Sequence, residues 1–178
     1  MDKTAEQPYS GPVLYIVHAP RKWNPKFFDE KDRKLAEANK KKIFTALERA
    51  AAKGVPVLYE SPPERDWLEG KINSLRRRPR VVWLRPNDVA SPHSLRTILE
   101  REKIAPKRIT ALGAYRNICV ITGMENMRRA FPKAELVMLE GANTIYRRAS
   151  GAHRADYRKR AKRNEISLAK KLGRKHLA

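Results

Sequence analysis

Cys119 is the single cysteine of this 178-residue chain, and it lies where a reactive thiol could do chemistry. It follows the apolar segment 108–114 and falls in the first turn of the amphipathic segment 117–131. Unpaired N–H groups and the helix dipole at a helix start favour anions and lower the pKa of a thiol. The amides of Ile118 and Cys119 would also be able to stabilise an oxyanion. The alternative is a small apolar residue, buried and inert among Ile118, Val120 and Ile121.

Other residues that could assist a thiol come at the ends of predicted strands. A cysteine nucleophile needs a base or a cation nearby, and His18 and Arg85 follow the first and third predicted strands. Tyr115 and Arg116, in the turn before the cysteine, would face the same pocket and contact a substrate, and an arginine there suits an anionic one. Glu60 ends the second predicted strand and would line the pocket.

These residues need a framework that brings strand ends together, and the hydrophobic pattern predicts one. Short apolar runs predict strands at 12–18, 55–60, 81–86, 108–114 and 134–141. Segments rich in helix formers predict helices at 34–53, 91–103 and 117–131, with a short helix between 61 and 80. This alternation predicts a mainly parallel sheet with helices on both faces, a three-layer α/β fold. Ligands of such sheets bind outside the carboxyl ends of the strands.

The composition fits a single globular domain, with 41% hydrophobic residues available for a core. No apolar run approaches the ~20 residues of a membrane span, and the N-terminal MDKTAEQPYSG lacks the apolar core of a signal peptide. We therefore expect a soluble, cytoplasmic protein with no membrane partner. One cysteine excludes an internal disulfide and a cysteine-rich zinc site. We divide the chain into a flexible arm (1–11), an α/β domain (12–145) and a basic helical extension (146–178).

The charge of the chain makes nucleic acid or another polyanion a candidate partner. Forty Lys and Arg against nineteen Asp and Glu give a net charge of +21, and the pI is about 10.5. The basic extension would neutralise phosphates, while Tyr146 and Tyr157 stack on bases. Its candidate phosphate contacts are Arg147, Arg148, Arg154, Arg158, Lys159, Arg160, Lys162 and Arg163. The alternative is a solvated helix face, and no DNA- or RNA-binding motif is present to support sequence-specific recognition.

The order and spacing of several segments resemble the isochorismatase-like cysteine hydrolases over roughly residues 11 to 145. "LERAAAKGVPVLYE" resembles the family's helix, small-residue turn and second strand. "APKRITALGAYRNICVITGMENMRRAFPKAELVMLEGANT" resembles its strand, glycine-containing turn, cysteine at a helix start and following strand, with Gly113, Cys119 and Val120 in the motif's spacing. The resemblance implies the family's three-layer fold and hydrolysis of a small amide or acyl compound. It also allows a homo-oligomer, because the family often assembles through helices.

The sequence departs from the family at two catalytic positions. The family has an Asp at the end of the first strand and a Lys at the end of the third, which activate the cysteine. Here either His18 or Val17 stands at the Asp position, and Arg85 stands at or near the Lys position. An arginine keeps the charge but cannot shuttle a proton. The segment SPPERD after the second strand also lacks the Asp-x-His of a nicotinamidase-type metal site, so we expect no metal and no cofactor.

Two functional interpretations follow from these departures. In the first, Cys119 is a nucleophile, His18 is its base and Arg85 supplies electrostatic assistance, which gives a cysteine hydrolase with a remodelled site. In the second, the catalytic set has decayed, and the protein is an inactive member of the fold that binds nucleic acid or another polyanion. The sequence leaves both open.

Overall fold

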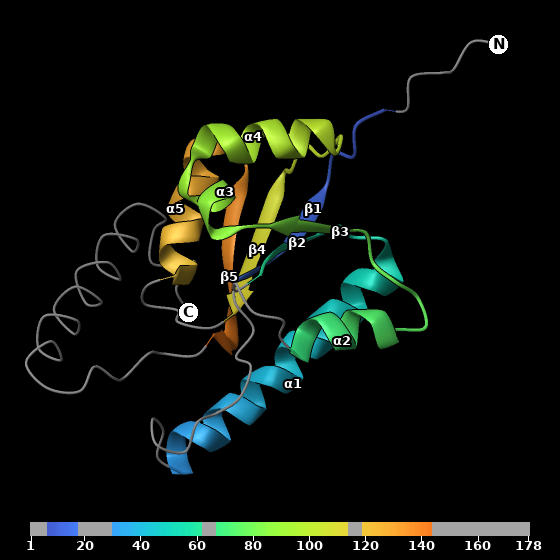
Figure 1. The fold of residues 1–178 in the computed structure, drawn as a ribbon, viewed down its shortest axis with the longest axis vertical. Helices are drawn as coiled ribbons and strands as arrows, with labels where there is room; N and C mark the ends of the chain where they lie inside the picture. The colour runs from blue at the N-terminus through green and yellow to red at the C-terminus, as the bar shows by residue number, and fades with distance from the viewer. Residues whose placement is uncertain (1–6, 18–29, 62–66, 114–118, 144–178) are drawn as a thin grey trace, which may run out of the picture.

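A five-stranded, all-parallel sheet forms the centre of the molecule in the computed structural model, which describes residues 7–17, 30–61, 67–113 and 119–143. The strand order is β3-β2-β1-β4-β5 (Figure 1). The strands are β1 (Pro12–Val17), β2 (Val57–Glu60), β3 (Val81–Leu84), β4 (Arg108–Gly113) and β5 (Glu135–Asn143). The predicted parallel α/β fold is therefore confirmed, with each strand near its predicted position.

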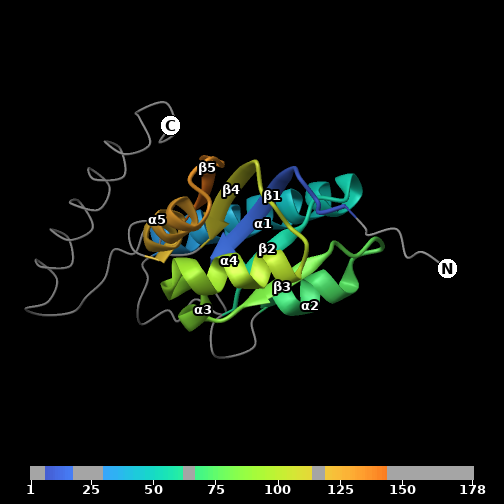
Figure 2. The same cartoon turned by 90° about the horizontal axis from the view of Figure 1, so that it is seen from above.

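Helices cover both faces of the sheet (Figures 1 and 2). Side chains of α1 (Glu30–Lys53) and α2 (Trp67–Ser74) pack on one face. Side chains of α3 (Pro86–Ala90), α4 (Pro92–Arg101) and α5 (Ile121–Ala130) pack on the other. We call these the α1 face and the α5 face. The result is the expected arrangement of three layers, with the sheet in the middle.

The two faces have separate hydrophobic cores, and β1 contributes to both. Successive side chains of a strand point to opposite faces, so Val13, Tyr15 and Val17 join the core of the α5 face. Leu14 and Ile16 join the core of the α1 face. All five are buried, which explains why this strand reads as one continuous apolar run in the sequence.

The connection from β3 to α4 differs from its prediction. The strand ends at Leu84, and the short helix α3, which the sequence analysis did not predict, begins at Pro86. Proline is favoured at the first position of a helix because its missing N–H needs no partner there, and the Arg85 N–H donates to the Asp88 carboxylate at 2.8 Å. The predicted cap of α4 is confirmed, since the Ser94 N–H donates to the Ser91 hydroxyl at 3.3 Å.

Residues 9–11, which the sequence analysis assigned to the N-terminal arm, pair with the chain before β4. The Tyr9 N–H donates to the Lys103 carbonyl, and the Ala105 N–H donates to the Tyr9 carbonyl, both at 2.8 Å. The predicted extension 146–178 lies outside the described residues. Among the described helices, none has both the length and the hydropathy that crossing a membrane requires.

Candidate active site

The carboxyl edge of the sheet has a point where the strand order reverses, and the candidate site is there. From β1 the chain continues first to β2 on one side and later to β4 on the other. Val17, the last residue of β1, pairs with Glu60 of β2 and with Gly113 of β4. These three strand ends are therefore in line, at the position where open α/β sheets bind their ligands.

Gly113 allows β4 to approach β1 closely at this edge. Its φ of +140° is a backbone conformation that residues with a side chain rarely adopt. A Cβ at this position would also overlap the carbonyl oxygen of Val17. The glycine therefore fixes where β4 ends, only a few residues before Cys119.

A buried hydrogen bond joins β1 to β2 on the α5 face. The Tyr15 hydroxyl donates to Oε2 of Glu60 at 2.6 Å, a short distance that is typical of a bond to a charged oxygen. The register explains the contact: Tyr15 pairs with Leu58, and Glu60 is two residues further along β2, so it points to the same face. Tyr15 is fully buried, and Glu60 is 7% exposed.

Burial makes Glu60 an unusual carboxylate. Loss of water raises its pKa from the ordinary value of 4.5 to about 6, although the hydrogen bond from Tyr15 acts in the opposite direction by stabilising the charged form. A carboxylate with this pKa is ionised at neutral pH and takes up a proton with less cost than an exposed one. These are the properties of a general base that works near neutral pH.

Cys119 lies close enough to Glu60 for their charges to interact. The cysteine and Val120 form a wide, π-helical turn immediately before α5, a geometry often found at functional sites. The thiol is partly buried against the core of the α5 face. Burial, and then the negative charge of Glu60, raise the pKa of the Cys119 thiol. The negative charge of Cys119 in turn contributes to the raised pKa of Tyr15, after burial and Glu60.

This direction is opposite to the one expected from a helix start. Unpaired amides at a helix start predict a lowered pKa for the Cys119 thiol, whereas its buried surroundings and the neighbouring carboxylate raise that pKa and favour the neutral thiol. A neutral thiol becomes a nucleophile when a base removes its proton during attack. Glu60 is the carboxylate whose charge reaches the Cys119 thiol, which makes it the candidate base among the described residues.

Arg85 is not brought into this group by any contact of the described residues. It follows β3, the edge strand, and its side chain is exposed. Its described hydrogen bonds are within the start of α3: its N–H donates to the Asp88 carboxylate, and its carbonyl accepts from the N–H groups of Asp88 and Val89. His18, Tyr115, Arg116 and Ile118 lie outside the described residues, as do the eight basic residues predicted to contact phosphates. Within the described part of the chain, no group of three or more His, Cys, Asp or Glu side chains could hold a metal ion.

Two residues of the candidate site, Tyr15 and Glu60, have contacts that were not predicted from the sequence. Tyr15 was read as part of an apolar strand, and nothing in the sequence separates it from the core residues beside it. Glu60 was expected to line a substrate pocket, not to interact with the thiol. A carboxylate at the end of a buried strand is the sequence signal for Glu60. Its contact with Tyr15 depends on the register of β1 against β2, which the sequence does not give.

Comparison with known proteins establishes the fold. No protein-family model matches the sequence, and no curated protein matches it. The MAR1 ribonuclease from Caenorhabditis elegans matches at 10% identity and a TM-score of 0.50, over 92% of this chain and 82% of that one. The nicotinamidase SaPncA from Staphylococcus aureus matches at 10% identity and a TM-score of 0.51, over 90% and 96%.

The N-carbamoylsarcosine amidase from Thermoplasma acidophilum has 17% identity, a TM-score of 0.47 and coverage of 84% and 91%. These structures are isochorismatase-like hydrolases, so the resemblance drawn from the sequence is confirmed for the fold. The two matches with a TM-score of at least 0.50 are named a ribonuclease and a nicotinamidase, so the fold alone does not select an activity.

Proposed function

We propose that this chain, which has the fold of the isochorismatase-like hydrolases, is a cysteine hydrolase of a small amide or related acyl compound. Cys119 is the nucleophile and Glu60 its general base. The observation that carries the proposal is the electrostatic interaction between the Glu60 carboxylate and the Cys119 thiol at the carboxyl edge of the sheet. The nicotinamidase fold match supports hydrolysis of a small amide.

The reaction follows from these two groups. As the sulfur of Cys119 bonds to the substrate carbonyl carbon, Glu60 takes the thiol proton and becomes a neutral carboxylic acid. Glu60 then gives this proton to the leaving amine or alcohol as the bond to the carbonyl breaks, which leaves a thioester. Water attacks the thioester, Glu60 takes a proton from that water, and the acid product leaves as the proton returns to the sulfur.

Tyr15 is a positioning residue in this scheme. Its hydrogen bond holds the Glu60 carboxylate at a fixed place in the core and limits the rise of its pKa. Without that bond, Glu60 would stay protonated to higher pH and would be unable to accept the thiol proton there.

His18 stays the alternative base proposed from the sequence. An imidazole ordinarily has a pKa near 6.5, close to the pKa of about 6 for Glu60. A pH profile of activity therefore does not separate the two residues, and substitution does. His18→Asn and Glu60→Gln should be measured side by side, since the base is the residue whose loss removes the acidic limb of the profile.

The test uses p-nitrophenyl acetate as a generic acyl probe. Wild-type protein should release an initial burst of nitrophenolate, and Cys119→Ser should show no burst because no thioester forms. Glu60→Gln should slow the burst by about 100-fold or more, the usual contribution of a general base. Glu100→Gln, which removes an exposed carboxylate on α4, is the matched control and should react at the wild-type rate. A Cys119→Ser protein as active as wild type would refute the proposal.

The second candidate function is the inactive polyanion-binding module, which the net charge of +21 favours. In that case the basic residues of the C-terminal extension, beginning with Arg147 and Arg148, contact phosphates, and Cys119 is only a core residue. The burst experiment separates the candidates, because a binding module has no acyl-transfer step.

A further inference from the structure

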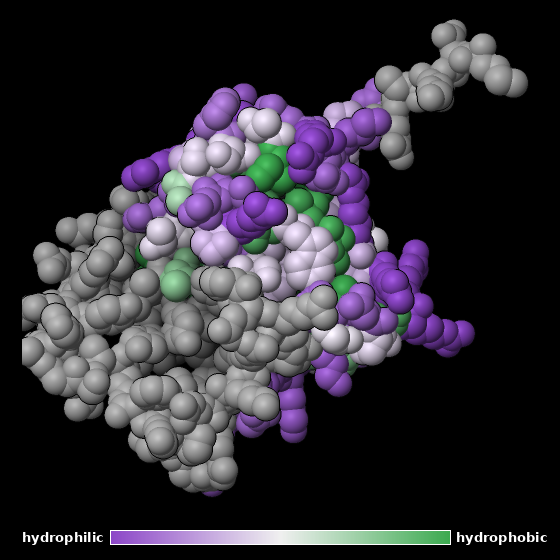
Figure 3. All heavy atoms as spheres, in the orientation of Figure 1, coloured by the Kyte–Doolittle hydropathy of each residue, from purple (hydrophilic) through white to green (hydrophobic). Residues whose placement is uncertain are grey.

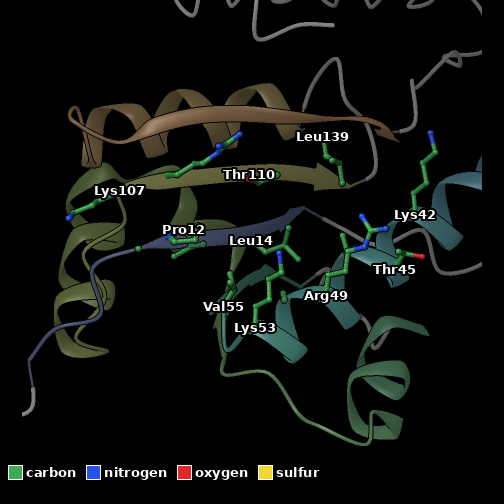
Figure 4. A pocket seen from close by; sticks show the side chains of 15 residues that line it. Pro12, Leu14, Lys42, Thr45, Arg49, Lys53, Val55, Lys107, Thr110 and Leu139 are labelled. Atoms are coloured by element: carbon green, nitrogen blue, oxygen red, sulfur yellow. The ribbon is translucent and has the colours of Figure 1, made fainter.

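A cavity lies on the α1 face, and Cys119 is not among its lining residues. Its volume is about 750 Å³, within the range of ligand-binding sites. The starts of β1 and β4, one side of α1 and Leu139 of β5 line it (Figure 4). The candidate active site uses the opposite face and the carboxyl edge of the same sheet. We call this cavity the α1 groove. Binding in it would not depend on the proposed reaction at Cys119.

Cationic side chains surround the α1 groove. They are Lys42, Arg49 and Lys53 of α1, and Lys107 and Arg108 at the start of β4. No carboxylate is among its described lining residues. Arg108 pairs with Glu135 at 3.5 Å. Within the described part of the chain, the other four cations have no ion-pair partner. An excess of positive charge around a cavity favours an anionic ligand.

The three cations of α1 form a row. Figure 4 shows Lys42, Arg49 and Lys53 along the same helix, beside the strands that carry Leu14 and Thr110. An α-helix rises 1.5 Å per residue, so the row spans about 16 Å, with about 6 Å from Arg49 to Lys53. A single phosphate is too small to neutralise charges spread over this length. The row fits a linear ligand that carries several negative charges.

The floor of the α1 groove is apolar. Leu14, Ala46, Val55 and Leu139 contribute to it. Apolar surface between cations suits a single strand of nucleic acid, whose bases and sugars are exposed. In a duplex the faces of the bases are stacked inside and cannot make such contacts. No aromatic side chain is among the described lining residues, so stacking of the kind that sequence-tolerant binders use is absent from this part of the groove. Affinity should therefore rest mainly on charge.

The basic C-terminal extension of this chain is unlike the ligand that the α1 groove favours, because it is itself strongly positive. Between residues 146 and 175 it carries twelve Lys and Arg against two Asp and Glu, a net charge of +10. Placing this segment beside five further cations brings like charges together. An external polyanion has the opposite sign and gains from the same arrangement.

We propose that the α1 groove binds a single strand of nucleic acid through its phosphates, without sequence preference. The expected signature is an affinity that falls steeply with salt, because each phosphate contact releases a counterion. For single strands the slope of log K against log salt is about −0.7 per contact.

The experiment measures fluorescence anisotropy of a labelled oligothymidylate of about 12 nucleotides, between about 0.05 and 0.2 M NaCl. The triple variant Lys42→Gln, Arg49→Gln and Lys53→Gln removes the α1 row and should reduce the slope by about 2, the sum of three contacts. The matched control is Lys41→Gln, Arg76→Gln and Arg78→Gln. It removes the same charge from exposed residues outside the groove, one of them on α1, and should keep the wild-type slope.

Four results would overturn the proposal: no binding, an unchanged slope in the groove variant, an equal loss in the control variant, or equal competition by an oligoglutamate of the same charge. A duplex of the same length that binds as tightly as the single strand would contradict the assignment to single strands. Cys119→Ser should bind like wild type. A failure of the hydrolase proposal therefore leaves this result unaffected, and the reverse also holds.

Discussion

At the residue scale, the candidate site depends on the balance of two effects at Glu60. Burial disfavours its charged form, while the Tyr15 hydrogen bond favours it, and the pKa of about 6 reflects both. The same carboxylate charge raises the pKa of the Cys119 thiol. The ionised Glu60 therefore discourages spontaneous formation of the Cys119 thiolate, and in the proposed reaction it would accept the thiol proton during attack.

Replacing Glu60 should change alkylation and catalysis in opposite directions. Above pH 6 the wild-type carboxylate is ionised and raises the pKa of Cys119. Glu60→Gln removes that charge, so the pKa of Cys119 should fall and iodoacetamide should label it faster near pH 8. The pH dependence of the labelling rate, followed by mass spectrometry, measures the shift. Hydrolysis should slow in the same variant.

The control for this experiment is Glu100→Gln, an exposed carboxylate of α4 that leaves the buried pair intact. Its labelling should follow the wild-type pH curve. If Glu60→Gln also followed the wild-type curve, the two groups would not interact, and the proposed general base would lose its support.

Glu60 should also make stability depend on pH. Its folded pKa of about 6 lies above the ordinary value of 4.5, so the folded state binds the proton more tightly than the unfolded state. This contribution is fully present below pH 4.5 and is lost as the pH rises through 6, a loss of about 2 kcal/mol. Urea unfolding of wild type and Glu60→Gln should therefore diverge by this amount between about pH 4 and pH 7. Parallel pH profiles would contradict the raised pKa.

Tyr15→Phe isolates the effect of the hydrogen bond. The hydroxyl favours the charged form of Glu60, so its removal should raise the pKa of Glu60 above the wild-type value of about 6. Carbon-13 NMR of the Glu60 carboxyl group measures the titration directly. The acidic limb of the activity profile should move to higher pH by the same amount. A titration that does not move, or that moves to lower pH, would exclude the positioning role of Tyr15.

The sequence identified Cys119 and its place at a helix start, because a single cysteine after a buried strand is visible in one dimension. It did not identify the Glu60–Cys119 interaction. That interaction depends on β2 and β4 lying on either side of β1, and on which face each side chain points to. The direction of the thiol pKa was wrong for a related reason, since burial and a carboxylate from another strand outweigh the local effect of the helix start.

At the scale of elements, the fit of α5 against β1 depends on Gly123. A Cβ at this position would overlap the Tyr15 hydroxyl and lie 2.9 Å from its ring carbons. Tyr15 is fully buried, so it has no empty space to move into. The glycine therefore lets the helix that follows Cys119 approach the Tyr15–Glu60 hydrogen bond.

Gly123→Ala should destabilise the protein although alanine is the better helix former. The overlap should cost about 1–3 kcal/mol, against a gain of up to about 1 kcal/mol in helix propensity. Gly70→Ala in α2 is the matched control: nothing lies within 4 Å of its Cβ position, so it should stabilise by up to about 1 kcal/mol. Urea unfolding measures both. Equal effects of the two substitutions would show that the Tyr15 contact does not constrain α5.

Most elements could be predicted from local pattern, and the exception has a local cause. The five strands and the main helices follow from apolar runs, helix formers and the Ser91–Pro92 start of α4. Helix α3 has only five residues, too few for a periodic pattern to emerge, and Pro86 was read as the end of a strand. The strand order was not predicted, because alternation of strands and helices does not specify which strands are neighbours.

At the scale of the whole molecule, the net charge of +21 works against compactness. Hydrophilic residues cover much of the described surface on the side shown in Figure 3. The described ion pairs on the surface, such as Arg80–Glu102 at 3.6 Å and Arg108–Glu135 at 3.5 Å, are exposed and contribute little. Repulsion among the excess cations is therefore the main long-range electrostatic effect on stability.

Salt should stabilise this protein. Raising NaCl from about 0.1 M to about 1 M shortens the Debye length from about 10 Å to about 3 Å and weakens the repulsion, so the Tm should rise. The comparison variant Lys41→Glu, Arg76→Glu and Arg78→Glu lowers the net charge from +21 to +15, since each substitution changes it by two. Its Tm at low salt should exceed that of wild type, and its gain with salt should be smaller. A Tm that falls with salt in wild type would contradict this.

Because the side chains of β1 alternate between the two faces of the sheet, this strand contributes both to the candidate active site and to the α1 groove. Leu14 lines the cationic α1 groove, and its neighbour Tyr15 points to the other face and bonds Glu60. An insertion or deletion of one residue within β1 would exchange these orientations. Such a change would place an aliphatic side chain opposite Glu60 and the Tyr15 phenol in the α1 groove. A shift of one residue in β1 would therefore disrupt the candidate active site and the α1 groove together.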